Sequence, residues 1–195
     1  MENIFIILII IFVLYVSYKI YTESDFFHLK CIISDKDSNT YCVRERKNME
    51  ESADLLAEVS RRLKKLVAYM EKTYPTRENV NRLKKNFNPK RVVETLPNST
   101  YTAYSENKGE KIAFCLEEKK GENKLIDLNT LTFVAIHELA HTMTKSIGHK
   151  PEFWENFKFL LENAVKIKVY TPIDYNKQHV SYCGMDITDN PLYDM

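Results

Sequence analysis

Residues 130–157 read TLTFVAIHELAHTMTKSIGHKPEFWENF, and this stretch decides the expected fold of the chain. Two histidines, His137 and His141, enclose a glutamate in an H-E-x-x-H pattern. Residues four apart share one face of a helix, with about 5–6 Å between their Cβ atoms, so both imidazoles can reach one Zn²⁺ ion. The pattern therefore predicts a metal-binding helix.

The same stretch predicts where this helix begins and ends. We expect it to cover about residues 130–146, with Asn129 or Thr130 as its N-cap. Gly148 suits the left-handed residue that follows a helix, and Pro151 suits the first turn of the next helix. The chain is therefore expected to reverse direction between these two residues. The apolar stripe of the helix comprises Phe133, Ile136, Ala140, Met143 and Ile147.

A catalytic zinc site needs a third protein ligand and one open coordination position. The metzincin pattern H-E-x-x-H-x-x-G-x-x-H is absent, because its glycine and third histidine would fall at Thr144 and Ile147. His149 follows the chain reversal and is the favoured third ligand. A glutamate of the next helix, Glu155 or Glu162, is the alternative, as in a thermolysin-like arrangement.

Glu138 is rotated by about 100° from His137 around the helix axis, so its carboxylate can lie beside the metal without binding it. Zinc lowers the pKa of a bound water to about 7, and a neighbouring carboxylate accepts the proton during attack on a carbonyl. Protonated Glu138 then delivers that proton to the leaving amine. Tyr182 and His179 are candidate donors to the developing oxyanion. These roles predict zinc-dependent hydrolysis of peptide bonds.

Short strands separated by turns are expected between residues 92 and 128. Alternating Thr and Tyr at 100–104 and apolar runs at 111–116 and 124–128 predict antiparallel hairpins. The run 111–116 is the candidate edge strand for an extended substrate, and an interior position is its alternative. The expected fold class is therefore α+β, with a small antiparallel sheet beside the metal-binding helix.

Three further helices are expected from apolar residues at helical spacing. The first covers residues 49–70 and ends near Tyr74, because Pro75 disfavours helix at the preceding residue. The second covers residues 76–88 and the third residues 151–168. The apolar stripe of the third helix is expected to pack against the metal-binding helix; it comprises Phe153, Trp154, Phe157, Leu160, Leu161, Ala164 and Val165.

The chain begins with an apolar run: residues 4–18 read IFIILIIIFVLYVSY, and the uncharged stretch resumes after Lys19. About 17–25 apolar residues cross a bilayer. Residues 1–22 are therefore predicted to form a single-pass transmembrane anchor, which contacts lipid through residues 4–22. A cleaved signal peptide is the alternative, but Glu2 precedes the run and bulky residues stand where cleavage requires small ones.

The charges that flank the run predict its orientation. No Lys or Arg precedes it, whereas Lys19 and Lys30 follow it. The positive-inside rule then places the body on the cytosolic side of the membrane.

Composition narrows the class of protein. Lys and Arg number 28 and Asp and Glu 27, for a net charge of +1, which argues against a dedicated nucleic-acid-binding domain. The 4 cysteines are too few and too scattered for a disulfide scaffold, and none has C-x-x-C spacing. They leave the redox compartment open.

The stretch 130–157 resembles the active-site segment of SprT and WLM-type zinc metallopeptidases. Residues 104–116 (YSENKGEKIAFCL) and 182–192 (YCGMDITDNPL) are also similar to segments of metallopeptidases of large DNA viruses. The resemblance implies a zincin-like domain, here residues 49–195 behind a juxtamembrane segment at 23–48. It also implies peptide-bond hydrolysis and a protein or peptide substrate, with the metal at His137, His141 and His149 and catalysis by Glu138.

Two other functions remain open. Members of the family that cleave proteins crosslinked to DNA carry additional DNA-binding elements. No such element is recognised in this sequence, which begins with the expected membrane anchor, so nucleic acid is not expected as a partner. A soluble DNA-repair protease would show steep salt dependence of DNA binding. The main alternative is a membrane-tethered structural or interaction protein that binds zinc without turnover. A fourth ligand such as His179 or Cys183 would favour it, because structural zinc usually has four protein ligands.

Overall fold

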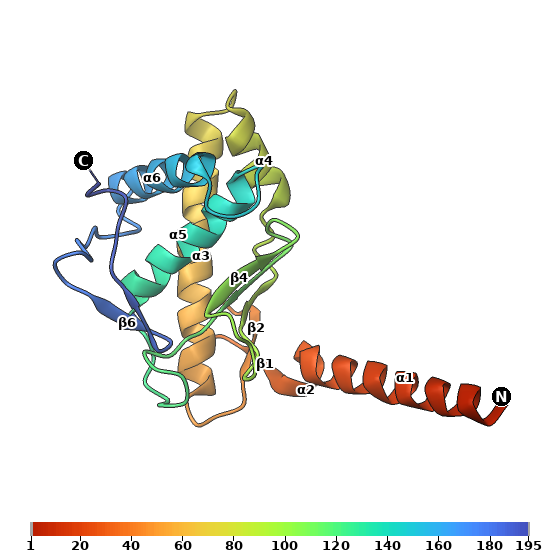
Figure 1. The fold of residues 1–195 in the computed structure, drawn as a ribbon. Coiled ribbons are helices and arrows are strands. Elements are labelled where there is room, and N and C mark those ends of the chain that lie inside the picture. Colours follow the sequence, from red (N-terminus) through yellow and green to blue (C-terminus); the bar gives the residue numbers. More distant parts are fainter. Residues whose placement is uncertain (1, 195) are drawn as a thin grey trace.

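Helix α3 (Met49–Thr73) runs through the centre of the body in the computed structural model, which describes residues 2–194 (Figure 1). Its apolar side chains recur every three or four residues, and this face is buried. It packs against α5 (Leu128–Met143) and α6 (Pro151–Lys166), and the buried residues of all three helices form one hydrophobic core. The architecture is therefore mixed α and β, with the helices forming most of the core.

The helices expected from apolar spacing are confirmed, with small shifts at their ends. The second of them is α4 (Glu78–Asn86), which packs against α3 and α5. On α6 the expected stripe is buried except at Val165, which is half-buried, and Trp154, which is exposed. Trp154 therefore does not belong to the core.

A three-stranded sheet lies beside α5 with the strand order β3-β5-β4. β3 (Val92–Glu94) runs parallel to β5 (Lys111–Phe114), and β4 (Ala103–Glu106) pairs antiparallel with the other side of β5. The expectation of a purely antiparallel sheet is wrong, because residues 95–102 carry the chain past the position of β5 before the β4–β5 hairpin forms. β5 is the buried interior strand and β4 is an edge strand, so the run 111–116 is not the expected edge, and its alternative, an interior position, is confirmed.

The strand expected at residues 124–128 is likewise absent. This segment makes one isolated bridge, between Glu117 and Leu125, and α5 begins at Leu128. The side chain of Asp127 caps this helix and so ends the extended backbone.

The turn between β4 and β5 packs closely against α5. Gly109 has a φ of 116°, and a Cβ atom there would lie 2.6 Å from Cγ2 of Thr142. Only glycine combines this backbone conformation with this approach. The turn therefore holds the edge strand beside the C-terminal half of the helix.

The segment at 23–48, expected as a juxtamembrane connector, contains a hairpin of β1 (Leu29–Ile33) and β2 (Thr40–Arg44). Tyr41 and Val43 of β2 lie in the same hydrophobic core as α3. Part of this segment is thus built into the folded body.

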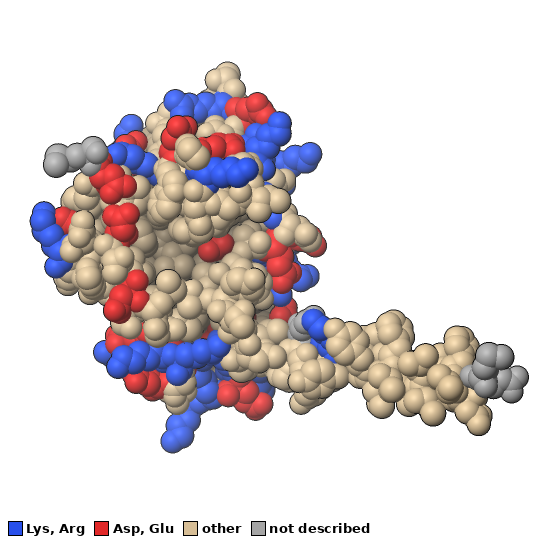
Figure 2. All heavy atoms as spheres, viewed as in Figure 1, with Lys and Arg blue, Asp and Glu red and all other residues tan. Residues whose placement is uncertain are grey.

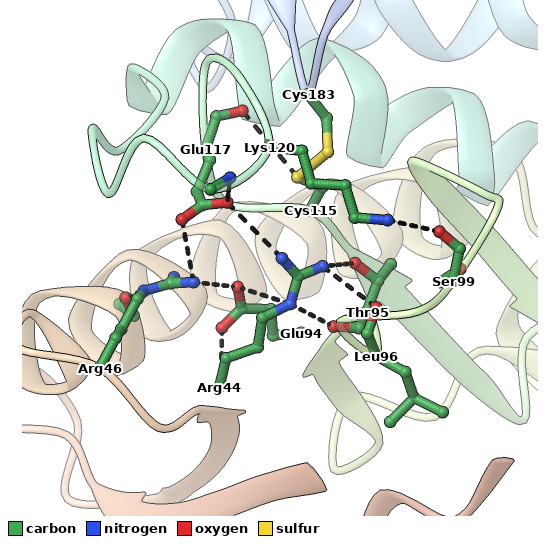
Figure 3. A network of polar contacts seen from close by, with 12 residues as sticks. Arg44, Arg46, Glu94, Thr95, Leu96, Ser99, Cys115, Glu117, Lys120 and Cys183 are labelled. Carbon is green, nitrogen blue, oxygen red and sulfur yellow. Dashed lines mark hydrogen bonds and ion pairs between the residues drawn. A yellow bond between two sulfur atoms is a disulfide. The ribbon is translucent and has the colours of Figure 1, made fainter. Parts of the chain in front are cut away.

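A buried ionic network fastens the hairpin to the sheet (Figure 3). Nη1 of Arg46 lies 2.6 Å from a carboxylate oxygen of Glu94, and Nη1 of Arg44 lies 3.5 Å from Glu117. The Arg44 guanidinium also donates to the carbonyl oxygen and the hydroxyl of Thr95, both at 2.8 Å. Both carboxylates are buried and have basic partners, as buried charges require.

All four cysteines form disulfides, so the expectation that they build no disulfide framework is wrong. Cys31–Cys42 links the two strands of the first hairpin. Cys115–Cys183 joins residues 68 apart in the sequence, at the end of β5 and between β6 (Val180–Tyr182) and β7 (Met185–Ile187). The second disulfide therefore fastens the C-terminal hairpin to the sheet.

Helix α1 (Glu2–Glu23) projects away from the body (Figure 1). Its segment Asn3–Thr22 is 20 residues long and apolar enough to cross a membrane, and the apolar stretch within it is not buried against the body. In Figure 2 its surface is almost free of charged residues. Length and composition therefore fit a membrane span, and a signal sequence near the N-terminus fits the same criteria.

Candidate active site

Helix α5 positions the H-E-x-x-H residues. Asp127 is its N-cap and accepts hydrogen bonds from the backbone N–H groups of Asn129 and Thr130, both at 2.9 Å. The expected caps are therefore wrong by two or three residues. The helix ends at Met143, so Ile147 lies in the next loop with 83% of its surface exposed and does not extend the apolar stripe.

The three histidines predicted as ligands lie together. Each of His137, His141 and His149 offers one ring nitrogen, and these nitrogens lie within 4.8 Å of one another. Nε2 of His149 is 3.0 Å from Nε2 of His137. Tetrahedral zinc with Zn–N distances of about 2.0–2.1 Å places its ligand nitrogens about 3.4 Å apart. The cluster therefore fits the donor set of a zinc ion.

The alternative ligands are not part of this cluster. Glu155 and Glu162 are both exposed on α6, outside the group of candidate ligands. His179 is also exposed and outside it, and Cys183 is bonded to Cys115. Over residues 2–194 the candidate ligand group thus comprises three histidines.

The loop that carries His149 is held by three side chains that sequence reasoning missed. Lys108, at the β4–β5 turn, donates to the carbonyl oxygens of residues 144 and 146, at 3.1 and 2.6 Å. Glu152 accepts from the backbone N–H groups of residues 145 and 146, and Trp154 Nε1 donates to the carbonyl of His149 at 3.1 Å. Gly148 has the expected positive φ, 78°, but it lies in the loop rather than directly after the helix, which ends at Met143. In the sequence, these supporting contacts were indicated only by Glu152 and Trp154, which follow Pro151.

Phe153 forms an apolar floor beneath the cluster. Its ring centroid lies 4.8, 4.4 and 4.6 Å from those of His137, His141 and His149. Burial, together with the neighbouring imidazoles, lowers the pKa of His137 to about 3 and that of His141 to about 4. Both rings are therefore neutral near pH 7, which is the form that binds a metal.

Glu138 lines the same open pocket as the three histidines, which has a volume of about 510 Å³. The residue is only 5% exposed, and burial raises the pKa of its carboxyl to about 8. Burial also raises the pKa of Tyr182, and the nearby charge of Glu138 adds to this effect. The Tyr182 hydroxyl donates to the carbonyl of Thr102 at 3.2 Å. That hydroxyl therefore already has an acceptor beside the edge strand.

Comparison with known proteins finds relatives in viruses. No family model matches the chain. Uncharacterized protein R325 of Acanthamoeba polyphaga mimivirus is 28% identical over 197 residues, covering 96% of this chain and 94% of that protein. Protein 136R of Invertebrate iridescent virus 6 is 37% identical over 75 residues, 37% of this chain and 40% of its own length. Protein 042R of Invertebrate iridescent virus 3 is 34% identical over 100 residues, 51% of this chain and 57% of its own length.

One comparison is with a solved structure. The crystal structure of Wss1 from Saccharomyces cerevisiae superimposes with a TM-score of 0.48 and 19% sequence identity, over 64% of this chain and 84% of that one. The chain is thus similar in sequence to one viral protein over nearly its whole length and to two others over shorter stretches.

Proposed function

We propose that this protein is a membrane-anchored, zinc-dependent metallopeptidase that hydrolyses peptide bonds. One observation carries the proposal: the clustered ring nitrogens of His137, His141 and His149 share an open pocket with the buried carboxyl of Glu138. Zinc-dependent hydrolysis requires neutral imidazoles that bind the metal and a nearby carboxyl group that does not bind it.

The residues of the pocket have separate tasks. His137, His141 and His149 would hold the ion, and a zinc ion supplies a Lewis acid that polarises the substrate carbonyl and lowers the pKa of water. Glu138 accepts the proton of the attacking water at its carboxylate and delivers it to the nitrogen of the leaving amine. Burial raises the pKa of this carboxyl from its usual range toward neutral pH, which suits a group that both takes up and releases a proton.

The edge strand β4 would bind the substrate. Its outer side pairs with no other strand of the sheet, and Ala103, Tyr104 and Ser105 line the pocket together with the histidines. The main chain of an extended peptide can hydrogen-bond to such an edge, with little demand on the peptide's sequence. We therefore propose a protein or peptide substrate rather than nucleic acid.

The position of the candidate fourth ligands disfavours the non-catalytic alternative. A structural zinc site usually has four protein ligands, whereas the described residues bring three together. Cys183 is committed to a disulfide, and His179 lies outside the group.

Zinc content and proteolysis test the proposal together. The full-length protein in detergent is expected to bind about one zinc ion per chain and to cleave a permanently unfolded protein. A chelator should stop cleavage, and added zinc, but not magnesium, should restore it. Bound zinc without cleavage across a broad panel of unfolded proteins would instead support the non-catalytic alternative.

Two signals disagree about the side of the membrane on which the body lies. Lys19 and Lys30 favour the cytosol through the positive-inside rule. Both disulfides favour an oxidising compartment, since cytosolic thiols are kept reduced. We propose the oxidising side, because the disulfides involve every cysteine of the chain whereas the charge bias rests on two lysines.

Thiol labelling of the protein extracted from cells distinguishes the two sides. The cysteines are expected to resist a polymer-tagged maleimide in denatured extracts, and all four should react after reduction. Protease added to the cytosolic side of sealed membranes should leave the body intact, and it should cleave the body once the membrane is made permeable. Labelling of four thiols without prior reduction would instead show that the body lies in the cytosol.

A further inference from the structure

The candidate active-site pocket borders on a second pocket that reaches the end of α1. The two pockets share Tyr101, Tyr104 and Ser105. The second has a volume of about 720 Å³, and its lining includes Thr22, the last residue of the apolar segment Asn3–Thr22. A path lined by β4 therefore connects the histidine cluster with the point where the chain would leave the membrane.

This path has a fixed position relative to the anchor. Nζ of Lys111 lies 3.0 Å from a carboxylate oxygen of Asp25, directly after α1, and 3.0 Å from Glu106 on β4. The side chain of Lys111 is only 8% exposed, whereas those of Asp25 and Glu106 are 32% and 47% exposed. Nδ2 of Asn98 also donates to the carbonyl oxygen of Thr22, at 2.9 Å. The anchor and the edge strand are thus joined through the ion pairs of a buried lysine and a surface hydrogen bond rather than through a flexible linker.

The surface near the anchor has the chemistry of a membrane interface. Tyr101 is 67% exposed and its ring lies 6.2 Å from that of Tyr104, at the junction of the two pockets. Tyrosine side chains are enriched where protein meets the headgroup region of a bilayer. Figure 1 shows α1 leaving the body on the side that carries β4 and the first hairpin.

We propose that the substrate is a membrane-anchored protein, cleaved in an extended segment close to its own membrane anchor. This inference rests on the proposed peptidase function and on α1 spanning the bilayer. Each pocket is on the order of 10 Å across, and an extended chain advances about 3.3 Å per residue. The scissile bond is therefore expected within about ten residues of the bilayer surface.

The test places the full-length protein in phosphatidylcholine vesicles with substrates that carry their own transmembrane helix. One cleavable sequence is placed about 5, about 20 or about 40 residues from that helix in an otherwise flexible segment, and it is also supplied as a soluble peptide. Cleavage of the nearest placement is expected to be at least about tenfold faster than cleavage of the farthest, because the effective concentration of a tethered site falls as its tether lengthens.

A matched variant separates fixed geometry from simple co-localisation in the membrane. Insertion of about 20 Gly and Ser residues between Glu23 and Ser24 keeps the anchor but removes the fixed distance. This variant should lose the preference for near placement while cleaving the soluble peptide at the wild-type rate. Asp25→Asn is a milder change that leaves Lys111 paired with Glu106, and it should reduce the preference in the same direction.

Each outcome has one meaning. If the wild type cleaves the soluble peptide but shows no distance preference, the inference is overturned and the proposed function stands. If the insertion variant keeps the preference, shared membrane location alone explains it, and the inference is again overturned. If no substrate is cleaved, including the soluble peptide, the proposed function itself fails.

Discussion

Glu138→Gln is expected to abolish peptide cleavage while leaving bound zinc at the wild-type level. Glutamine has nearly the same shape as the buried glutamate and lies outside the ligand group, so the histidine cluster should persist. It cannot accept the proton of the attacking water, and loss of a general base typically costs a factor of about 10² to 10⁴. Zinc per chain by elemental analysis and the initial rate on an unfolded protein measure the two effects.

Glu155→Gln is the matched control for this substitution. Glu155 is exposed on α6 and has no place in the pocket, so its variant should retain both zinc and cleavage. Equal cleavage by wild type and Glu138→Gln would remove Glu138 from the mechanism.

His149→Ala should weaken zinc binding by at least about a hundredfold, because loss of a direct ligand exceeds the 10- to 100-fold effect of losing a supporting contact. His149 is exposed in a loop, so its truncation creates no cavity in the core and should leave the thermal unfolding midpoint nearly unchanged. Competition with a chromophoric chelator gives the affinity, and thermal unfolding in the presence of a chelator gives the stability.

Glu162→Gln tests the alternative third ligand under the same conditions. Glu162 is exposed on α6, outside the histidine cluster, and its variant should bind zinc as the wild type does. A loss of affinity in Glu162→Gln comparable with that in His149→Ala would show that a glutamate completes the site instead.

The metal-binding helix and its turn could be predicted because their signals are local. His137 and His141 share a helical face by spacing alone, and Gly148 and Pro151 mark the reversal that brings His149 back. Phe153 belonged to a predicted core stripe, yet it also touches all three imidazoles. Helical periodicity identifies a buried face but not which buried groups lie next to it.

Apart from local shifts at helix ends and the exposed Trp154, the errors concern pairings between distant segments. β5 reads as a short apolar run, and such a run fits an edge or an interior strand equally well until its neighbours are known. The partner of Cys115 is 68 residues away and becomes adjacent only when the C-terminal hairpin packs on the sheet. The support of the His149 loop by Lys108 likewise depends on how the β4–β5 turn meets α5.

The ionic network between the first hairpin and the sheet limits how this protein can be shortened. A fragment that starts at Met49 would lack Arg44 and Arg46. Glu94 and Glu117 would then be buried carboxylates without their basic partners. Removing one partner of a buried ion pair costs about 3–5 kcal/mol, a large part of the stability of an ordinary domain. The smallest autonomous unit is therefore expected to start upstream of Leu29, because the hairpin that leads into these arginines is part of the folded body.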